Sequence, residues 1–79
     1  MVLDIKKRIE TGKVLFGIKQ TLKNIKNVEK VYVPTDCREE ILKMLYNNKL
    51  EVKKTEFSKT DMASKLELDF QCEVFAFRK

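Results

Sequence analysis

One short stretch gathers the residues whose chemistry is most informative. An apolar run at 13–16 leads into Gly17, and Lys19, Gln20 and Lys23 follow at the expected start of a helix. A helix N-terminus with added positive side chains attracts anions such as phosphate. The Gln20 amide carries a donor and an acceptor suited to a base edge, and Lys19 suits the O6 and N7 acceptors of guanine. The alternative is an ordinary helix with a solvated face, and the spacing alone leaves both open.

Enzyme chemistry has little support in the sequence. No histidine is present and there are only two glycines, which removes Ser-His-Asp and Cys-His schemes and glycine-rich phosphate loops. Cys37 stands at a possible helix start, where a thiol can be activated, but it lacks a histidine base, so we expect it to be structural. Glu39 and Glu40 are expected to compensate a helix dipole. Cys37 and Cys72 form no CxxC pair, so we expect neither a metal site nor a disulfide. With the enzyme motifs also missing, we expect no catalytic residue and no cofactor.

The net charge of +5 is unevenly distributed along the chain. Residues 1–30 carry eight basic and three acidic side chains, whereas residues 31–79 carry nine of each. This asymmetry favours an anionic partner, such as nucleic acid, that docks on the N-terminal part. The other explanation is a lysine-rich solvated surface.

Length and hydropathy point to one folded domain. A chain of 79 residues with 43% hydrophobic side chains can pack a single small core. No apolar run approaches the ~18 residues of a membrane-spanning helix, and Asp4 and Glu10 argue against a secretory signal. Free cysteines are typical of a reducing compartment, so we expect a cytoplasmic protein.

Hydrophobic periodicity predicts four helices, each followed by a strand. The first helix covers 2–10, with Val2, Ile5 and Ile9 on one face and Gly12 as its left-handed terminator. The strands are expected at 13–16, 31–33, 50–52 and 72–77, and Pro34 closes the second. Such alternation predicts an α/β protein, a three-layer α/β/α sandwich around a four-stranded mixed sheet.

The other three helices are predicted from their apolar stripes and caps. A helix at 18–27 turns Ile18, Leu22 and Ile25 towards the core. The next helix begins with a capping-box-like pair, Asp36 and Glu39, ends near 47–48, and carries Ile41, Leu42, Leu45 and Tyr46. Ser58 and Asp61 open the last helix, which carries Met62 and Leu66.

The sequence resembles the family of ribosomal proteins that bind kink-turn RNA. That superfamily includes the large-subunit ribosomal protein L-thirty-e, the box C/D and H/ACA ribonucleoprotein core protein, and short bacterial relatives. The pattern TGK-x3-G-x-K-x-T-x-K, here Thr11 to Lys23, is close to the L-thirty-e form. The resemblance continues through Val31–Val33 and Asp36 to the C-terminal strand. It implies the α/β/α sandwich and a single RNA-binding domain over 1–79.

The resemblance also implies a role for each residue of the stretch. In that family the glycine-led helix start enters the widened major groove of a kink-turn and reads tandem sheared G·A pairs. Carried over, Gly17 allows the backbone to approach, Lys19 and Gln20 face the guanines, and Lys23 faces a phosphate or base. Ile18 belongs to the same RNA-binding segment.

A second family element precedes the last strand and covers the three-nucleotide bulge of the kink-turn. Here it is the triplet Leu68, Asp69 and Phe70. Phe70 is expected to stack on an unpaired base; the alternative is a core position, which is common for aromatic residues near a terminal strand. Many family members have glycines where this chain has Ala63 and Glu67.

We favour RNA binding in a ribosome or another ribonucleoprotein as the function. The expected partners are RNA and ribonucleoprotein proteins, and no membrane contact is expected. We expect a cytoplasmic, ribosome-associated protein that is a monomer in isolation. A protein-interaction adaptor of the same fold is the alternative, since fold alone does not fix function. Such adaptors tend to be acidic, whereas this chain is basic at the helix that matters. A small enzyme is the third reading, and it lacks a base, a nucleophile or a metal cluster.

Overall fold

The chain alternates helix and strand four times, as predicted. The computed structural model describes residues 2–79. A 3-10 helix, η1, is inserted after the second α-helix. The elements are α1 (Val2–Glu10), β1 (Val14–Phe16), α2 (Ile18–Lys23), η1 (Ile25–Asn27), β2 (Val28–Val33), α3 (Glu39–Asn47), β3 (Val52–Lys54), α4 (Lys59–Lys65) and β4 (Phe75–Arg78). None of the helices in this part of the chain has the length and apolar character needed to cross a bilayer.

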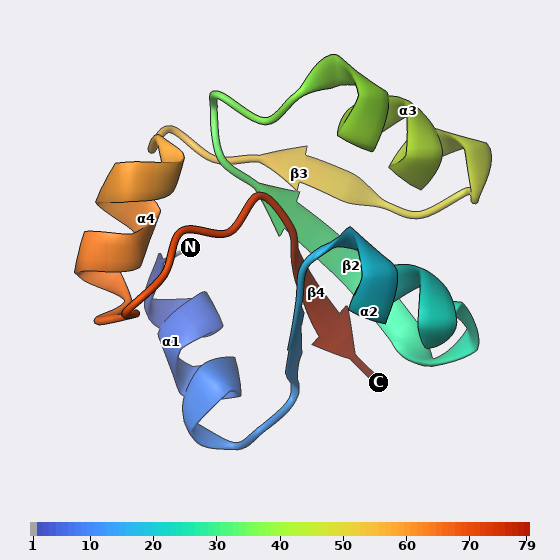
Figure 1. The fold of residues 1–79 in the computed structure, drawn as a ribbon. Coiled ribbons are helices and arrows are strands. Elements are labelled where there is room, and N and C mark those ends of the chain that lie inside the picture. Colours follow the sequence, from blue (N-terminus) through green and yellow to red (C-terminus); the bar gives the residue numbers. More distant parts are fainter. Residues whose placement is uncertain (1) are drawn as a thin grey trace.

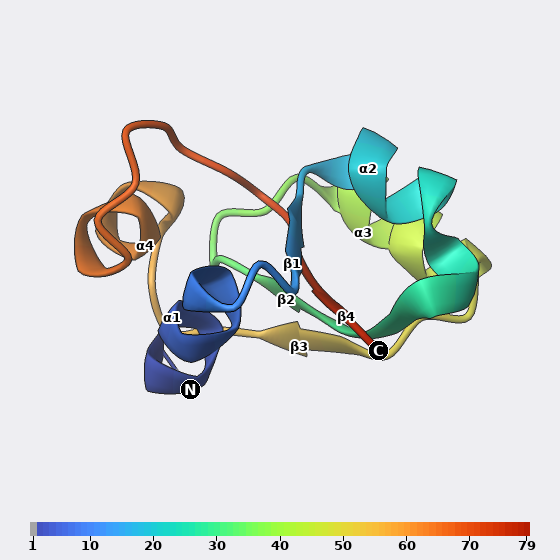
Figure 2. The same ribbon diagram turned by 90° about the horizontal axis from the view of Figure 1, so that it is seen from below.

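The four strands form one mixed sheet between two layers of helices. The strand order is β1-β4-β2-β3. The central strand β4 pairs antiparallel with β1 and β2, and β3 pairs parallel with β2. Helices α1 and α4 cover one face, and α2 and α3 cover the other (Figures 1 and 2). The predicted α/β/α sandwich with a four-stranded mixed sheet is therefore confirmed.

Each face of the sheet has its own hydrophobic core, because successive strand residues point to opposite sides. On the α1 and α4 side the core consists of Ile5, Val14, Tyr32, Met62, Leu66, Cys72, Phe75 and Phe77. On the α2 and α3 side it consists of Val28, Val31, Val33, Ile41, Leu45, Val74 and Ala76. The residues of β4 and its approach alternate between the two cores. This explains why 74–77 are all apolar and why the run at 31–33 is buried, as predicted.

The predicted helix at 18–27 is shorter than expected. It ends at Lys23, and the Asn24 side-chain amide donates to the Gln20 carbonyl at 2.9 Å before η1 begins. In a 3-10 helix residues repeat every 3.0 positions rather than 3.6, so Ile25 in η1 does not continue the stripe of α2 in register. Ile18, Leu22 and Ile25 are all only half-buried. The fully buried residue of α2 is Thr21 instead.

The bounds of all four strands also differ from the prediction. Strand β1 begins at Val14 rather than residue 13, and β2 begins at Val28 rather than residue 31. Strand β3 covers 52–54 rather than 50–52, and β4 covers 75–78 rather than 72–77. The position of β3 is set by its register on β2, which pairs Val31 with Val52. Leu50 is not in the strand but caps the C-terminus of α3, where its N–H donates to the Leu45 carbonyl at 3.2 Å.

The predicted capping box of α3 is wrong. Its N-cap is Arg38, and the Asp36 carboxylate instead accepts the Lys59 N–H at 2.9 Å, at the start of α4. The prediction for α4 is confirmed, because the Ser58 hydroxyl accepts the Asp61 N–H at 3.2 Å. Tyr46 does not face the core, since 59% of it is exposed.

Helices α1, α3 and α4 end in the same Schellman motif. In each, a left-handed residue follows the C-cap, and two N–H groups bond back to the last carbonyls. In α1 that residue is Gly12, with φ 71°, as predicted. In α3 and α4 it is Lys49, with φ 59°, and Glu67, with φ 58°. The left-handed conformation raises the free energy of both residues relative to a glycine at the same position.

Candidate nucleic-acid interface

Gly17 forms a sharp turn between β1 and α2. Its φ of 88° and ψ of 159° lie in a region that only glycine adopts readily. The Gly17 N–H donates to the Val74 carbonyl at 3.0 Å. A Cβ added here would meet no atom within 4 Å, so the backbone at this turn faces open space. The turn therefore needs glycine for its conformation, and its backbone is accessible to a ligand.

Thr21 holds the carbonyl side of this turn, a role the sequence analysis missed. Its hydroxyl donates to the Gly17 carbonyl at 2.9 Å, and its N–H donates to the same oxygen at 3.2 Å. Thr21 is completely buried. The signal in the sequence was a threonine four residues after the glycine, the spacing at which a helix places one residue over the other.

The polar residues that follow Gly17 are free to meet a ligand. Lys19, Gln20 and Lys23 are exposed, and within residues 2–79 neither lysine forms an ion pair. The first turn of α2 has no acidic residue. Ile18 differs from them, because it is half-buried and packs against the core under α2 and α3. Ile18 thus anchors the segment while its neighbours face outward.

The second predicted segment lies in the loop between α4 and β4. Leu68 is half-buried against the core under α1 and α4, so it fastens the loop, whereas Asp69 is exposed. Phe70 is 49% exposed, and its ring lies edge-on to Phe16, with centroids 5.4 Å apart and an interplanar angle of 88°. Phe70 is therefore neither a core residue nor isolated in solvent. Because Phe16 directly precedes Gly17, this contact brings the two predicted segments together.

An ion cluster fixes the last part of this loop. The Arg38 Nε donates to both Glu73 oxygens at 3.1 Å, and the Lys59 Nζ lies 3.4 Å from one of them. Burial raises the pKa of Glu73, but the hydrogen bonds from Arg38 and Lys59 and the charge of Arg38 outweigh this and hold that pKa below its ordinary value. The cluster ties the approach to β4 to the starts of α3 and α4, and sequence patterns give no sign of these long-range partners.

The same side chains line an open hollow beside the Gly17 turn. Its volume is about 390 Å³, and Gly17, Ile18, Gln71, Arg38, Lys59 and Glu73 contribute to it. The hollow lies between the start of α2 and the loop that leads to β4. The hollow therefore adjoins the Gly17 turn and carries both polar and charged groups, but Leu68, Asp69 and Phe70 do not line it.

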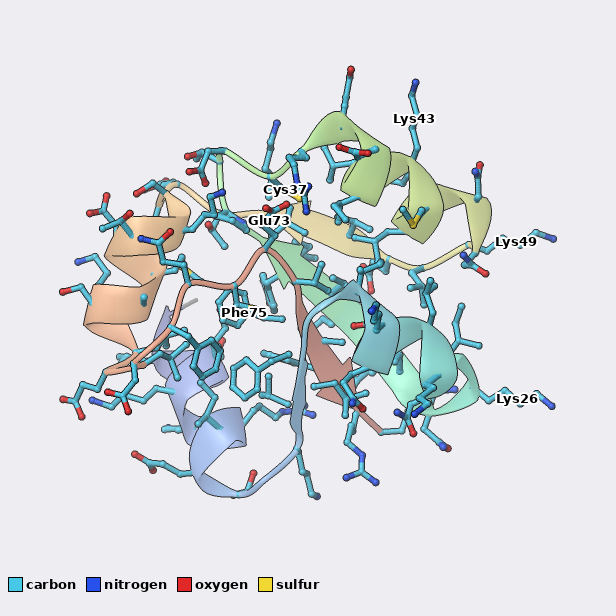
Figure 3. All side chains as sticks on the ribbon, viewed as in Figure 1. Lys26, Cys37, Lys43, Lys49, Glu73 and Phe75 are labelled. Atoms are coloured by element: carbon cyan, nitrogen blue, oxygen red, sulfur yellow. The ribbon has the colours of Figure 1, made fainter. Side chains whose placement is uncertain are left out.

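Cys37 lies next to Glu73 at the start of α3 (Figure 3). Burial, followed by the negative charge of Glu73, raises the pKa of its thiol to about 11. A thiol with that pKa is protonated at neutral pH and is a poor nucleophile. This agrees with the expectation that Cys37 is structural. Burial likewise raises the pKa of Cys72, whose Sγ lies 3.0 Å from the Val74 carbonyl.

Comparison with known proteins identifies the fold. No protein-family model matches the sequence, and no curated protein sequence does. Solved structures do match. One is described as a Giardia lamblia 15.5kD RNA binding protein. It superposes with a TM-score of 0.71 and 17% sequence identity, over 95% of this chain and 68% of that chain. The chain shares the fold of that protein. The four-stranded mixed sheet and its two helical layers are therefore features of a fold that an RNA-binding protein also has.

Proposed function

We propose that this protein binds RNA through the surface formed by Gly17, Lys19, Gln20, Lys23 and Phe70. The observation that carries the proposal is the contact between Phe16 and Phe70. It joins two segments that the family resemblance separately assigns to RNA, in a fold that the 15.5kD RNA binding protein also has. Unpaired lysines beside an open glycine backbone suit a phosphate-rich ligand better than an acidic protein surface.

The preferred ligand is an RNA kink-turn with tandem sheared G·A pairs. The exposed backbone at Gly17 lets the RNA approach closely, so that Lys19 and Gln20 reach guanine edges and Lys23 reaches a phosphate or base. The half-exposed ring of Phe70 stacks on an unpaired base of the bulge, with Asp69 beside it. Ile18 and Leu68 support these residues from the two cores. The protein acts as a monomeric, non-enzymatic component of a cytoplasmic ribosome or related ribonucleoprotein.

Binding to a kinked and a straight RNA tests this proposal. A kink-turn oligonucleotide and a fully paired duplex of equal length are titrated with the protein over a range of salt concentrations. We expect clear preference for the kinked RNA and weaker binding as salt rises. Equal, weak binding to both would leave only nonspecific basicity and would favour the protein-interaction adaptor.

Replacing Lys19 tests the predicted base contact. Lys19→Ala should weaken kink-turn binding by about 1–3 kcal/mol, the range for a good base-edge contact, and leave the melting temperature unchanged, because Lys19 is exposed and unpaired. Lys43→Ala is the matched control, since Lys43 is an exposed lysine that points into solvent from α3 (Figure 3). Equal effects of the two substitutions would remove Lys19 from the interface.

A further inference from the structure

A second positively charged surface lies at the other end of the sheet. Gly17 follows the end of β1, whereas this groove lies where β1 begins and β4 ends. It has a volume of about 570 Å³. We define the basic groove by its five cationic side chains, from α1, the turn after it, β2 and the segment after β4, namely Lys7, Arg8, Lys13, Lys30 and Lys79. Its acidic members are Asp4 and Glu29.

Two cations of the basic groove are held in place over one aromatic ring. The Arg8 guanidinium lies 4.8 Å from the ring centre of Phe77 and donates to the Arg78 carbonyl at 3.1 Å. The Lys30 ammonium lies 5.6 Å from the same ring. Phe77 is 2% exposed, so its ring orients the cations but offers no face on which a base could stack. The groove therefore suits an anion rather than a nucleobase.

The other three cations are available to a ligand. Lys7, Lys13 and Lys79 are exposed, and none forms an ion pair within residues 2–79. Glu29 is the partner of Arg8, with 3.5 Å between Nη1 and Oε2. The positive charge that remains is complementary to closely spaced phosphates, which bind to such lysines with release of counterions.

The basic groove is joined to the RNA-binding surface through the backbone. The Lys79 N–H donates to the Asn27 carbonyl at 2.7 Å, and the Arg78 N–H donates to the Lys13 carbonyl at 2.9 Å. Asn27 ends η1, which continues from α2 and carries Lys26, a side chain that points into solvent at this end of the molecule (Figure 3). Lysines thus extend from α2 along η1 to the groove. The longest dimension of the chain is 29 Å, which a single RNA helix can span.

We propose that the basic groove binds the phosphate backbone of a helical stem that flanks the RNA segment recognised at Gly17. This inference rests on the proposed function. We expect the contact to be independent of sequence, because a regular stem presents phosphates along its whole length and the ring of Phe77 is too buried to stack on a base. The proposal assigns a function to Lys7 and Lys13. Both lie at the start of β1 and not at its end, where Gly17 follows.

A triple charge substitution tests the proposal. The groove variant is Lys7→Gln, Lys13→Gln and Lys79→Gln. The control variant has the same change in charge, Lys43→Gln, Lys49→Gln and Lys53→Gln, on the exposed surface of α3 and β3. Both are titrated with kink-turn RNAs whose stems are either long or cut to the shortest length that still folds, and thermal melting confirms that both are folded.

We expect the groove variant to bind the long-stem RNA about 10- to 100-fold more weakly than the wild type at 0.1 M salt. The steepness of the plot of log K against log salt should fall by roughly 2–3, because each lost phosphate contact lowers it by about 0.9. The control variant should change the affinity for either RNA by less than about threefold. On short-stem RNA the groove variant should bind as tightly as the control variant does. Equal losses in the two variants on long stems, or an undiminished loss on short stems, would overturn the inference alone. A wild type that binds kinked and straight RNA equally would overturn the proposed function and this inference with it.

Discussion

Replacing Gly17 by alanine separates what the turn needs for folding from what it offers to RNA. At φ 88° and ψ 159° an L-residue costs about 1–3 kcal/mol. No atom lies within 4 Å of the added methyl group, so the whole cost comes from the backbone. The residue cannot relax cheaply, because hydrogen bonds to Val74 and Thr21 hold both sides of the turn, and each contributes about 1 kcal/mol.

The expected loss of stability is therefore about 1–3 kcal/mol. For a domain of this size each kcal/mol lowers the melting temperature by about 4–8 °C, so Gly17→Ala should melt roughly 5–20 °C below the wild type. Its methyl group also projects into the space that the RNA backbone would occupy. Affinity for the kink-turn, measured at a temperature where the variant remains folded, should fall by at least about tenfold, the effect of 1.4 kcal/mol. Gly17→Val, with its β-branched side chain, should lose more of both.

Gly12→Ala is the matched control. Gly12 also has a positive φ, 71°, and open space around an added Cβ, but it ends α1 at the other end of β1. It should lose about 1–2 kcal/mol of stability and retain the wild-type affinity for a short-stem kink-turn RNA, which does not reach the basic groove beside Gly12. A Gly17→Ala protein that melts like the wild type would refute the conformational argument. One that binds RNA as well as Gly12→Ala does would refute the close approach of RNA to this backbone.

Three further predictions concern Phe70, Glu67 and Glu73. Phe70→Ala should cost about 0.5–1.5 kcal/mol of stability, for the lost edge contact with Phe16, and about 1–3 kcal/mol of RNA affinity; a large fall in melting temperature with unchanged affinity per folded molecule would contradict stacking. Glu67→Gly should stabilise the protein by up to about 1 kcal/mol and tighten RNA binding, because Glu67 places a negative charge directly before the Leu68–Phe70 segment. Lys49→Gly, at the equivalent position of α3, should raise only the melting temperature; equal RNA affinities of the two variants would contradict a position of Glu67 near the RNA. The pKa of Glu73 is lower in the folded protein than its ordinary value, so its contribution to stability is present above about pH 4.5 and is lost as the pH falls through the folded pKa. Urea unfolding at several pH values should show a steeper acid loss in the wild type than in Glu73→Gln, and parallel profiles would contradict this.

The features that the sequence predicted correctly are set by neighbouring residues. The order of helices and strands follows from apolar spacing, and Gly12 and the pair Ser58 and Asp61 mark helix ends through contacts within a few residues. The run at 31–33 indicated burial on both sides because a central strand has a core on each face. These signals do not depend on where the rest of the chain lies.

The features that escaped prediction depend on distant partners. Asp36 has the spacing of a capping residue, yet its carboxylate bonds to Lys59, 23 residues away. The bounds of β3 follow from its register on β2, which alternation of side chains cannot fix to within two residues. The cluster of Arg38, Lys59 and Glu73 likewise joins three separate segments. For the proposed RNA surface, the family resemblance indicated both segments, but only the structure shows that Phe16 and Phe70 meet.

The central place of β4 in the sheet has a consequence for the protein's synthesis. Strand β1 pairs only with β4 among the described strands, and the Gly17 turn is fastened to the carbonyl of Val74. At about 5–20 residues per second, several seconds separate the synthesis of Gly17 from that of Val74. During that interval β1 has no neighbour and the turn has no anchor. If the Gly17 turn binds RNA as proposed, the nascent chain cannot use it until residue 74 has been translated. A polypeptide interrupted before residue 74 would lack both a complete sheet and the anchored turn.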